Sequence, residues 1–185
     1  PNHTGANTSS TYSGMTVGKT EVIFLIDKEK DCVYYLKVVD NTHIHITKRR
    51  TYLKSVSILD DEYRTKPLIE EIEVAELSIP LTIGYWSINY DPTNDCVYFC
   101  CTSNYFVPTN GSVLVTEIKV DTWKVKQYEV PNTANTNLRT DSCWQMFVAS
   151  GYLLIKKYDS PYDLYKIQIS NPANITEFKR TNCSS

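Results

Sequence analysis

The sequence predicts an all-β protein built from antiparallel strands. From Glu21 onward, short runs rich in β-branched and aromatic residues alternate with polar turns. No segment combines a convincing helical period with helix caps. A ten-residue pattern of strand, turn and strand also occurs twice. Together these three observations favour β-hairpins over any helical architecture.

The repeated pattern covers residues 26–35 and 90–99, an offset of 64 positions from Ile26 to Tyr90. In both copies an Asp-rich turn separates two apolar runs, and the second run begins with Cys-Val-Tyr. Aspartate side chains bond to the backbone of tight turns, so each copy predicts a β-hairpin. A third hairpin with a tighter turn is expected over residues 144–158.

Two further strands follow the second and third hairpins. They are expected at residues 112–120 and 125–130, and at residues 164–170 and 175–180. Each unit is therefore a four-strand antiparallel meander of roughly 45 to 50 residues, which resembles a β-propeller blade. The repeat-like units span approximately residues 21–80, 84–130 and 143–183.

The number of units leaves the closure of the fold open. Closed propellers typically have four or more blades, whereas this sequence has two clear units and an irregular first one. Residues 43–79 are one candidate for a fourth, irregular blade. Alternatively, the strands form a closed lipocalin-like barrel or a β-sandwich. A third alternative is a larger ring completed by another copy or another chain.

Two segments depart from the regular pattern. Residues 63–77 fit either a helix with Leu68, Ile69, Ile72 and Leu77 on one face or a strand interrupted by one slip. Residues 1–17 are rich in Ser, Thr, Asn and Gly and have no apolar period, which predicts a flexible, glycosylated N-terminal arm. Residues 18–185 are then expected to form a single all-β domain.

The cysteines predict disulfide bonds. They form an even set without C-x-x-C spacing, which favours disulfides over zinc or redox chemistry. Cys143 and Cys183 bracket the third unit and are expected to join. The remaining pairings stay open. The six cysteines are Cys32, Cys96, Cys100, Cys101, Cys143 and Cys183.

Glycosylation motifs point to the same compartment. The acceptor pattern N-x-S/T occurs at Asn2, Asn7, Asn110, Asn174 and Asn182. The chain begins at Pro1, which we interpret as a mature chain whose signal peptide has been removed. No apolar stretch reaches the ~20 residues of a membrane span. The sequence therefore predicts a glycoprotein that is secreted or lies on the extracellular face of the cell surface, either soluble or as an excised ectodomain.

No catalytic, metal or cofactor site is predicted. The net charge of −2 and scattered basic residues argue against nucleic acid. His43 and His45 share one face of a strand, but a third metal ligand is lacking nearby in sequence. The contiguous acidic residues at 60–62 and 70–73 are typical of solvated turns or faces. Nucleophile elbows, phosphate-binding loops and H-E-x-x-H motifs are not found, so we expect no enzyme.

Binding is the remaining class of function. We predict a protein-binding module that engages an extracellular partner, such as a host factor, cytokine or receptor, through loops on a disulfide-braced scaffold. Two alternatives are a lipocalin-type carrier of a small ligand and a carbohydrate-binding or carbohydrate-active propeller. An oligomer is possible under the larger-ring interpretation. The candidate partner-binding residues are the aromatic Trp86, Tyr105, Phe106 and Tyr162.

Overall fold

The fold is known from a computed structural model, and it is all-β. The structure describes residues 3–5, 8–10, 21–30, 32–40, 42–51, 69–80, 83–103, 113–130, 143–157 and 162–179. Regular secondary structure within these ranges consists of fourteen strands, which confirms the predicted class. None of the described residues belongs to a helix long and apolar enough to cross a membrane.

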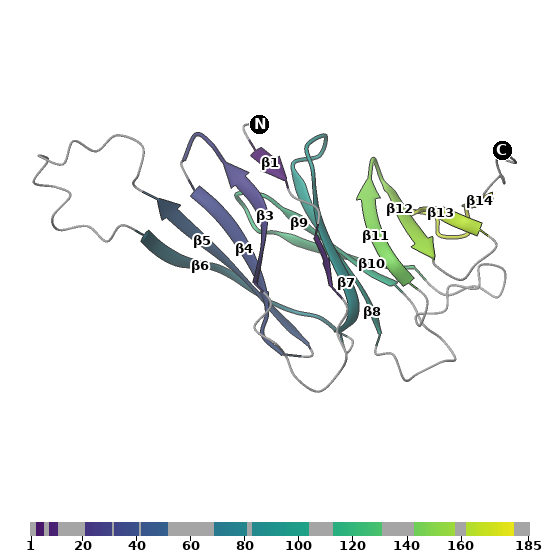
Figure 1. The fold of residues 1–185 in the computed structure, drawn as a ribbon, viewed down its shortest axis with the longest axis horizontal. Helices are drawn as coiled ribbons and strands as arrows, with labels where there is room; N and C mark the ends of the chain where they lie inside the picture. The colour runs from purple at the N-terminus through teal and green to yellow at the C-terminus, as the bar shows by residue number, and fades with distance from the viewer. Residues whose placement is uncertain are drawn as a thin grey trace, which may run out of the picture.

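The strands form three antiparallel sheets, called A, B and C in chain order (Figure 1). Sheet A contains β1 (His3–Gly5), β3 (Glu21–Asp27), β4 (Cys32–Val38), β5 (His43–Thr51) and β6 (Ile69–Ser78). Sheet B contains β2 (Thr8–Ser10), β7 (Ile83–Asp91), β8 (Cys96–Ser103), β9 (Val113–Lys119) and β10 (Val125–Val130). Sheet C contains β11 (Cys143–Ala149), β12 (Tyr152–Lys157), β13 (Tyr162–Gln168) and β14 (Ile175–Lys179).

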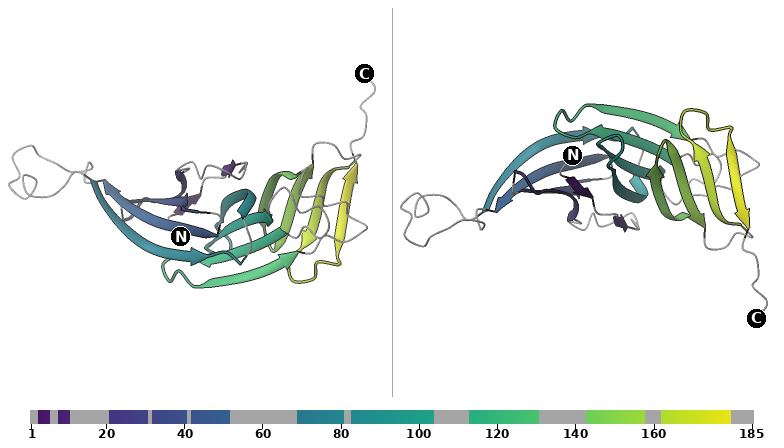
Figure 2. Two further views of the ribbon diagram at one scale, coloured as in Figure 1. Left: turned by 90° about the horizontal axis from the view of Figure 1, so that it is seen from below. Right: turned by 90° about the horizontal axis from the view of Figure 1, so that it is seen from above.

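Each sheet has a four-strand meander in which neighbours in sequence are neighbours in space. The predicted units are therefore confirmed at this level. The sheets follow one another along the long axis of the molecule, with sheet B between A and C (Figure 2). None of the three sheets closes on itself, so the expectation of a lipocalin-like barrel is wrong for the described residues. The first and last strands of each meander do not pair with each other, so each sheet stays open.

Two hydrophobic cores separate the three sheets, and β8 contributes to both. Val97, Phe99 and Cys101 face the core between sheets A and B. Between sheets B and C, the neighbouring positions Tyr98 and Cys100 face the second core. Because side chains alternate across a strand, a sheet buried on both faces reads as a continuous apolar run. This explains the uninterrupted sequence Cys-Val-Tyr-Phe-Cys-Cys that begins at position 96.

The internal repeat corresponds to equivalent hairpins. Asp27 is paired with Cys32 at the turn between β3 and β4. In the same way, Asp91 is paired with Cys96 between β7 and β8. The third hairpin reverses more tightly, because only Ser150 and Gly151 separate β11 from β12. The predicted hairpins are thus confirmed in all three sheets.

The undecided segment at residues 63–77 is a strand where the structure describes it. Ile46 is paired with Ala75, but its neighbour Thr47 is paired with Glu73. Val74 is therefore an extra residue in β6, which forms a β-bulge. The bulge accounts for the slip that interrupted the period-two pattern of the sequence.

Two short stretches of the predicted N-terminal arm, residues 3–5 and 8–10, are strands. β1 pairs with β3, and β2 pairs with β7. These pairings need only backbone groups, so a polar sequence without an apolar period can still form them. Gly5 lies so close to sheet B that a Cβ atom there would be 2.3 Å from the Cβ of Tyr90.

The four cysteines with described side chains are buried free thiols, so the structure gives no support to the predicted disulfides at Cys32, Cys96, Cys100 and Cys101. Cys100 and Cys101 face different cores because they are adjacent on one strand. Cys96 and Cys100 face the same core, but their Cα atoms are ~13 Å apart at ~3.3 Å per residue, beyond the ~7 Å reach of a disulfide. The side chain of Cys143 and all of Cys183 lie outside the described residues, and their pairing stays a prediction.

Candidate functional site: the hairpin end

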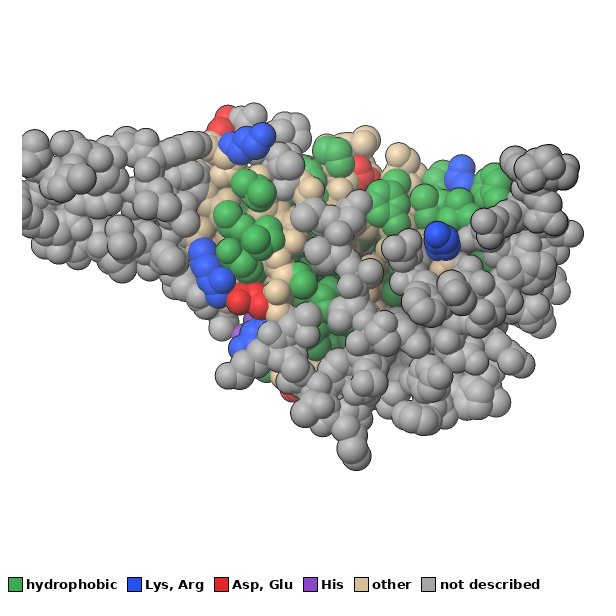
Figure 3. All heavy atoms as spheres, viewed as in Figure 1, with side chains coloured by type: hydrophobic (Ala, Val, Ile, Leu, Met, Phe, Trp, Pro, Cys, Tyr) green, Lys and Arg blue, Asp and Glu red, His purple; other side chains and the backbone are tan. Residues whose placement is uncertain are grey.

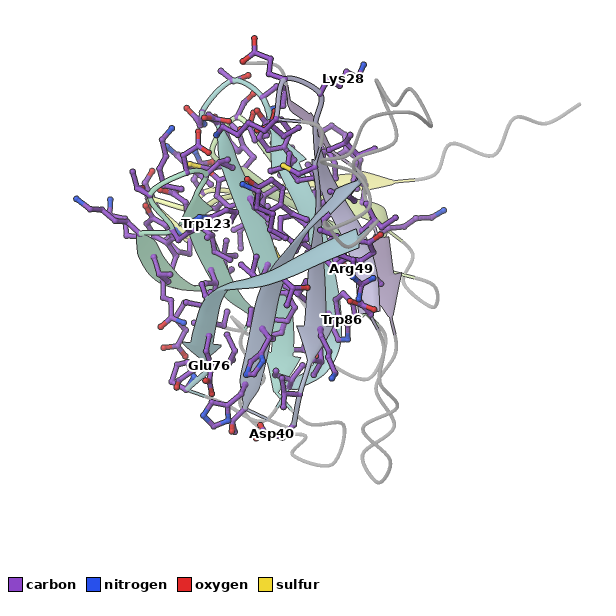
Figure 4. The ribbon with its side chains drawn as sticks, turned by 90° about the vertical axis from the view of Figure 1, so that its left-hand side faces the viewer. Lys28, Asp40, Arg49, Glu76, Trp86 and Trp123 are labelled. Carbon is purple, nitrogen blue, oxygen red and sulfur yellow. The ribbon has the colours of Figure 1, made fainter. Side chains whose placement is uncertain are left out.

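Five described turns lie at one end of the three sheets, and the hairpins between β3 and β4, β7 and β8, and β11 and β12 mark this end at the top of Figure 1. We call this surface the hairpin end. It consists of the turns at residues 28–30, 92–95, 120–124, 150–151 and 169–174. Lys28 marks this end in Figure 4, and Asp40 marks the opposite end.

A buried aspartate organises the first turn. Asp27 is 3% exposed, and its Oδ1 accepts hydrogen bonds from the backbone N–H groups of Glu29 (3.1 Å) and Lys30 (3.0 Å). The Lys30 ammonium lies 3.6 Å from the other carboxylate oxygen. A carboxylate that accepts local backbone bonds fixes the turn geometry, so this loop is held in one conformation.

The equivalent aspartate in sheet B holds its own turn and also reaches sheet C. Asp91 Oδ1 accepts from the Thr93 backbone N–H at 2.9 Å, and Oδ2 accepts from the Asn94 side chain at 3.1 Å. Oδ2 is also 3.4 Å from the backbone nitrogen of Ser150, in the turn of sheet C. One buried carboxylate therefore links two turns from different sheets.

A second polar contact links sheets A and B at the same end. Lys30 Nζ donates to Asp121 Oδ1 at 2.8 Å, across 91 positions of sequence. This hydrogen bond is the main reason that the pKa of Lys30 is raised above its ordinary value. The pair is about half exposed, so we expect it to position the two turns rather than to add much stability.

Backbone strain is concentrated in the same turns. Among the described residues, the non-glycine positions with positive φ are Asp95 (50°), Asp121 (67°), Trp123 (55°) and Ser150 (50°). All four belong to the hairpin end. Such conformations persist only where surrounding contacts hold them, and they cluster at functional surfaces.

An aromatic contact braces the strained turn that follows β9. Trp123 packs against the core between sheets A and B, and its ring centroid is 5.2 Å from that of Tyr34. Its backbone N–H donates to the Lys119 carbonyl at 2.8 Å. Lys119 Nζ in turn donates to the Asn94 carbonyl at 2.6 Å. The turns after β7 and β9 are thus fixed to each other and to the core.

The predicted partner-binding aromatics do not gather at this site. Trp86 is 2% exposed and packs on Phe99 with 5.7 Å between ring centroids, so it is a core residue and offers no binding surface. Sheet B is covered on both faces, which is why this aromatic is buried. Tyr162 begins β13, but its side chain is outside the described set, as are Tyr105 and Phe106.

One predicted glycosylation site lies within the described residues. Asn174 is exposed in the turn between β13 and β14, and its side-chain amide donates to Gln168 Oε1 at 2.9 Å. Its position at the hairpin end is compatible with a solvated glycan, whose presence stays a prediction. The other four acceptor residues, Asn2, Asn7, Asn110 and Asn182, lie outside the described residues.

The two histidines with described side chains are paired with carboxylates at the opposite end. His43 Nδ1 is 2.9 Å from Asp40 Oδ2, and His45 Nε2 is 3.5 Å from Glu76 Oε1. The Thr42 backbone N–H and then His43 lower the pKa of Asp40 to about 2. No group of three or more metal-ligating side chains occurs among the described residues.

The signal for the hairpin end was present in the sequence as the repeated Asp-rich turns. It pointed to local turn structure, but the links between Asp91 and Ser150 and between Lys30 and Asp121 depend on how the sheets stack. Comparison with models of known protein families, with curated proteins and with solved structures found no match.

Proposed function

We propose that this chain is an extracellular protein-binding module that contacts its partner through the hairpin end. Its three blade-like sheets act as a rigid support, and the chain itself carries out no catalysis. The observation that carries the proposal is the linkage of turns from three sheets into one surface by Lys30–Asp121 and Asp91–Ser150. Loops held by a rigid scaffold are the usual location of binding residues.

The composition of this surface suits a protein partner. Lys28, Asp121 and Lys124 are exposed and bring both charge signs to the surface. Preorganised turns lose little conformational entropy on binding, which favours affinity. A mixed-charge surface also favours a partner with a complementary pattern rather than a polyanion.

The alternative of a small-ligand carrier requires a closed barrel, which the described sheets do not form. A lipocalin-type carrier encloses its ligand in a closed barrel, and the described sheets stay separate with side chains filling both spaces between them. The carbohydrate alternative has no specific observation in its favour, so we do not develop it further.

A binding screen tests the proposal directly. The purified chain is presented to an array of secreted proteins and cell-surface ectodomains, and each positive binder is measured against variants. Lys28→Glu and Lys124→Glu reverse charges at the hairpin end, and we expect about tenfold or greater loss of affinity.

Asp40→Lys is the matched control for these variants. It reverses a charge on an exposed turn at the opposite end of the molecule (Figure 4) and should leave affinity unchanged. The proposal fails if no ectodomain binds, or if Asp40→Lys weakens binding as much as the hairpin-end variants do.

A further inference from the structure

Sheets A and C end the stack, and each has one face that no other described sheet covers (Figure 2). On sheet C, Met146, Leu153 and Ile155 face sheet B. Their neighbours along the strands therefore point to the opposite, outer face. Half-buried or exposed side chains on that outer face are Phe147, Tyr152, Leu154, Leu164 and Phe178.

These outer side chains form two apolar pairs across the strands, and Lys156 and Lys166 lie between them on β12 and β13. Phe147 on β11 is directly opposite Leu154 on β12, and Leu164 on β13 is directly opposite Phe178 on β14. Phe178 is 46% exposed, the largest value among the exposed large hydrophobic side chains described. Hydrophobic side chains gather over sheet C on the right of Figure 3.

The outer face of sheet A is also apolar at its centre. Ile23 is 40% exposed and is opposite Tyr35, and Ile26 is 37% exposed and is opposite Val33. Arg49 stacks on Tyr35 at 4.1 Å and also bonds to Glu21. This face resembles an interface patch with a polar border rather than an ordinary solvated sheet face.

The internal repeat shows which kind of neighbour each outer face fits. By the 64-residue offset, Val33 and Tyr35 in sheet A correspond to Val97 and Phe99 in sheet B. Val97 and Phe99 are buried against the preceding sheet. The outer face of sheet A thus has the side chains of a face that receives a preceding sheet.

The outer face of sheet C has the opposite role. Tyr98 in sheet B faces the following sheet. It is the second residue after Cys96, which closes the hairpin of sheet B. The second residue after Tyr152, which closes the hairpin of sheet C, is Leu154. Sheet C therefore presents a face for a following sheet that the described chain does not supply. The two outer faces are the two halves of the junction that already occurs twice inside the molecule.

Charge on the two faces is also compatible with their contact. Lys156 and Lys166 are the charged side chains described on the outer face of sheet C. Sheet A contributes Glu21 and Glu76 to its outer face, together with the basic Lys37 and Arg49. A contact of sheet C with itself brings lysines together, whereas a contact with the mixed-charge face of sheet A offers Glu21 and Glu76 as partners for them.

We propose that a second copy of this chain covers both faces, with sheet A of each copy stacked on sheet C of the other. Such a head-to-tail contact either closes into a ring or extends into a filament. Two copies bring six sheets together, which is within the usual four to eight blades of a closed propeller. The inference uses the end faces and does not depend on partner binding at the hairpin end.

The oligomeric state of the chain tests this proposal. After enzymatic removal of glycans, light scattering and sedimentation should give twice the 21.2 kDa mass of one chain. A chain that stays monomeric at all concentrations contradicts the proposal. A series of larger polymers contradicts ring closure.

Surface variants identify which faces meet. Ile23→Lys on sheet A and Phe178→Lys on sheet C should each weaken the two-copy state by about tenfold or more, since each places a charge in both junctions. Val125→Lys is the matched control, because Val125 is also 40% exposed but lies on β10 of sheet B. All three positions are exposed, so melting temperatures should stay close to that of the wild type.

A mixing experiment separates the proposed contact from its alternatives. In a mixture of the Ile23→Lys and Phe178→Lys chains, a mixed pair retains one unaltered junction, so part of the two-copy species should return. If Phe178→Lys dissociates the pair while Ile23→Lys has no effect, sheet C packs on sheet C and the proposal is wrong.

Discussion

The two junctions between the sheets are built differently. The junction of sheets A and B is filled by large aromatic side chains, with Phe24 and Tyr34 from sheet A against Trp86 and Phe99 from sheet B. In the junction of sheets B and C, most side chains are smaller, such as Cys100, and valines are frequent. The stability of the first junction therefore depends on the volume of the side chains that it buries.

The second junction depends on a buried amide. Asn89 is 1% exposed; its side-chain nitrogen donates to the Val148 carbonyl at 2.7 Å, and its oxygen accepts from the Val148 N–H at 3.0 Å. Val148 lies on β11, the inner edge strand of sheet C. One side chain thus satisfies a donor and an acceptor on an edge that no further strand of the described residues pairs with, and it fixes the register between two sheets.

The internal repeat places a different residue at the position equivalent to Asn89. The 64-residue offset places Leu25 where sheet B has Asn89, and Leu25 is fully buried in the first junction. Sheet A meets a sheet whose inner edge is already paired with β2, whereas β11 has no such added strand among the described residues. At this position, the amide is buried where it bonds to a strand edge, and the apolar side chain is buried where the facing edge is already paired.

Trp86→Ala is expected to have the largest effect on stability. It removes the largest fully buried side chain and leaves a cavity in the aromatic junction, which costs about 3–5 kcal/mol of unfolding free energy. Chemical denaturation measures the loss. Val125→Ala at an exposed position should change stability by less than about 0.5 kcal/mol. A loss near that of the control would mean that the junction does not depend on volume.

Asn89→Leu tests the polar junction. It leaves both backbone groups of Val148 buried without their partner, so we expect a loss of about 2–4 kcal/mol despite the added apolar surface. The same substitution should shift the equilibrium toward the open state of this junction. The rate of hydrogen exchange at the Val148 amide should rise by at least the factor by which that equilibrium shifts.

The reciprocal variant is Leu25→Asn. It buries an amide opposite an edge that is already paired, and we expect a similar loss of about 2–4 kcal/mol. If either exchange is neutral, the two positions are not specialised in the way the comparison indicates.

Gly5→Ala tests a further difference between the two junctions. β1 pairs with sheet A and β2 pairs with sheet B, whereas neither of these strands pairs with sheet C. The added Cβ would meet the Cβ of Tyr90 at 2.3 Å, and neither atom is at the end of a flexible side chain. We expect a loss of about 1–3 kcal/mol by overpacking. Hydrogen exchange should increase at β3 and β7 and stay unchanged at β13. Equal exchange rates in wild type and variant would show that the N-terminal strands do not brace this junction.

Local features of the fold could be predicted from the sequence. The Asp27 and Asp91 turns were predictable because their carboxylates bond to backbone groups only a few positions away. The strands of each meander followed from the same short-range alternation. Val74 shows the limit of this reasoning, since a bulge and a helical turn disturb a period-two pattern similarly.

Features that depend on sheet stacking could not be predicted. Trp86 was expected at a binding surface, but a strand buried on both faces gives no sequence signal for which aromatics are exposed. The even number of cysteines predicted disulfides, although alternation places Cys100 and Cys101 in separate cores. The β1 and β2 strands also escaped prediction, because backbone pairing with an open edge needs no apolar side chains.

The two adjacent thiols Cys100 and Cys101 provide the most local test, because each one faces a different junction. Burial raises the pKa of Cys100 to about 12 and raises the pKa of Cys101 as well, so in the folded chain both are protonated and resist iodoacetamide. In the Asn89→Leu chain Cys100 should react first, and in the Trp86→Ala chain Cys101 should react first, because each thiol reports the junction that it faces. Mass mapping of the labelled peptides, after unfolding without a reducing agent as a reference, measures both rates. If the unfolded reference leaves either cysteine unlabelled, that thiol is in a disulfide; if both variants label the two thiols equally, the junctions open together.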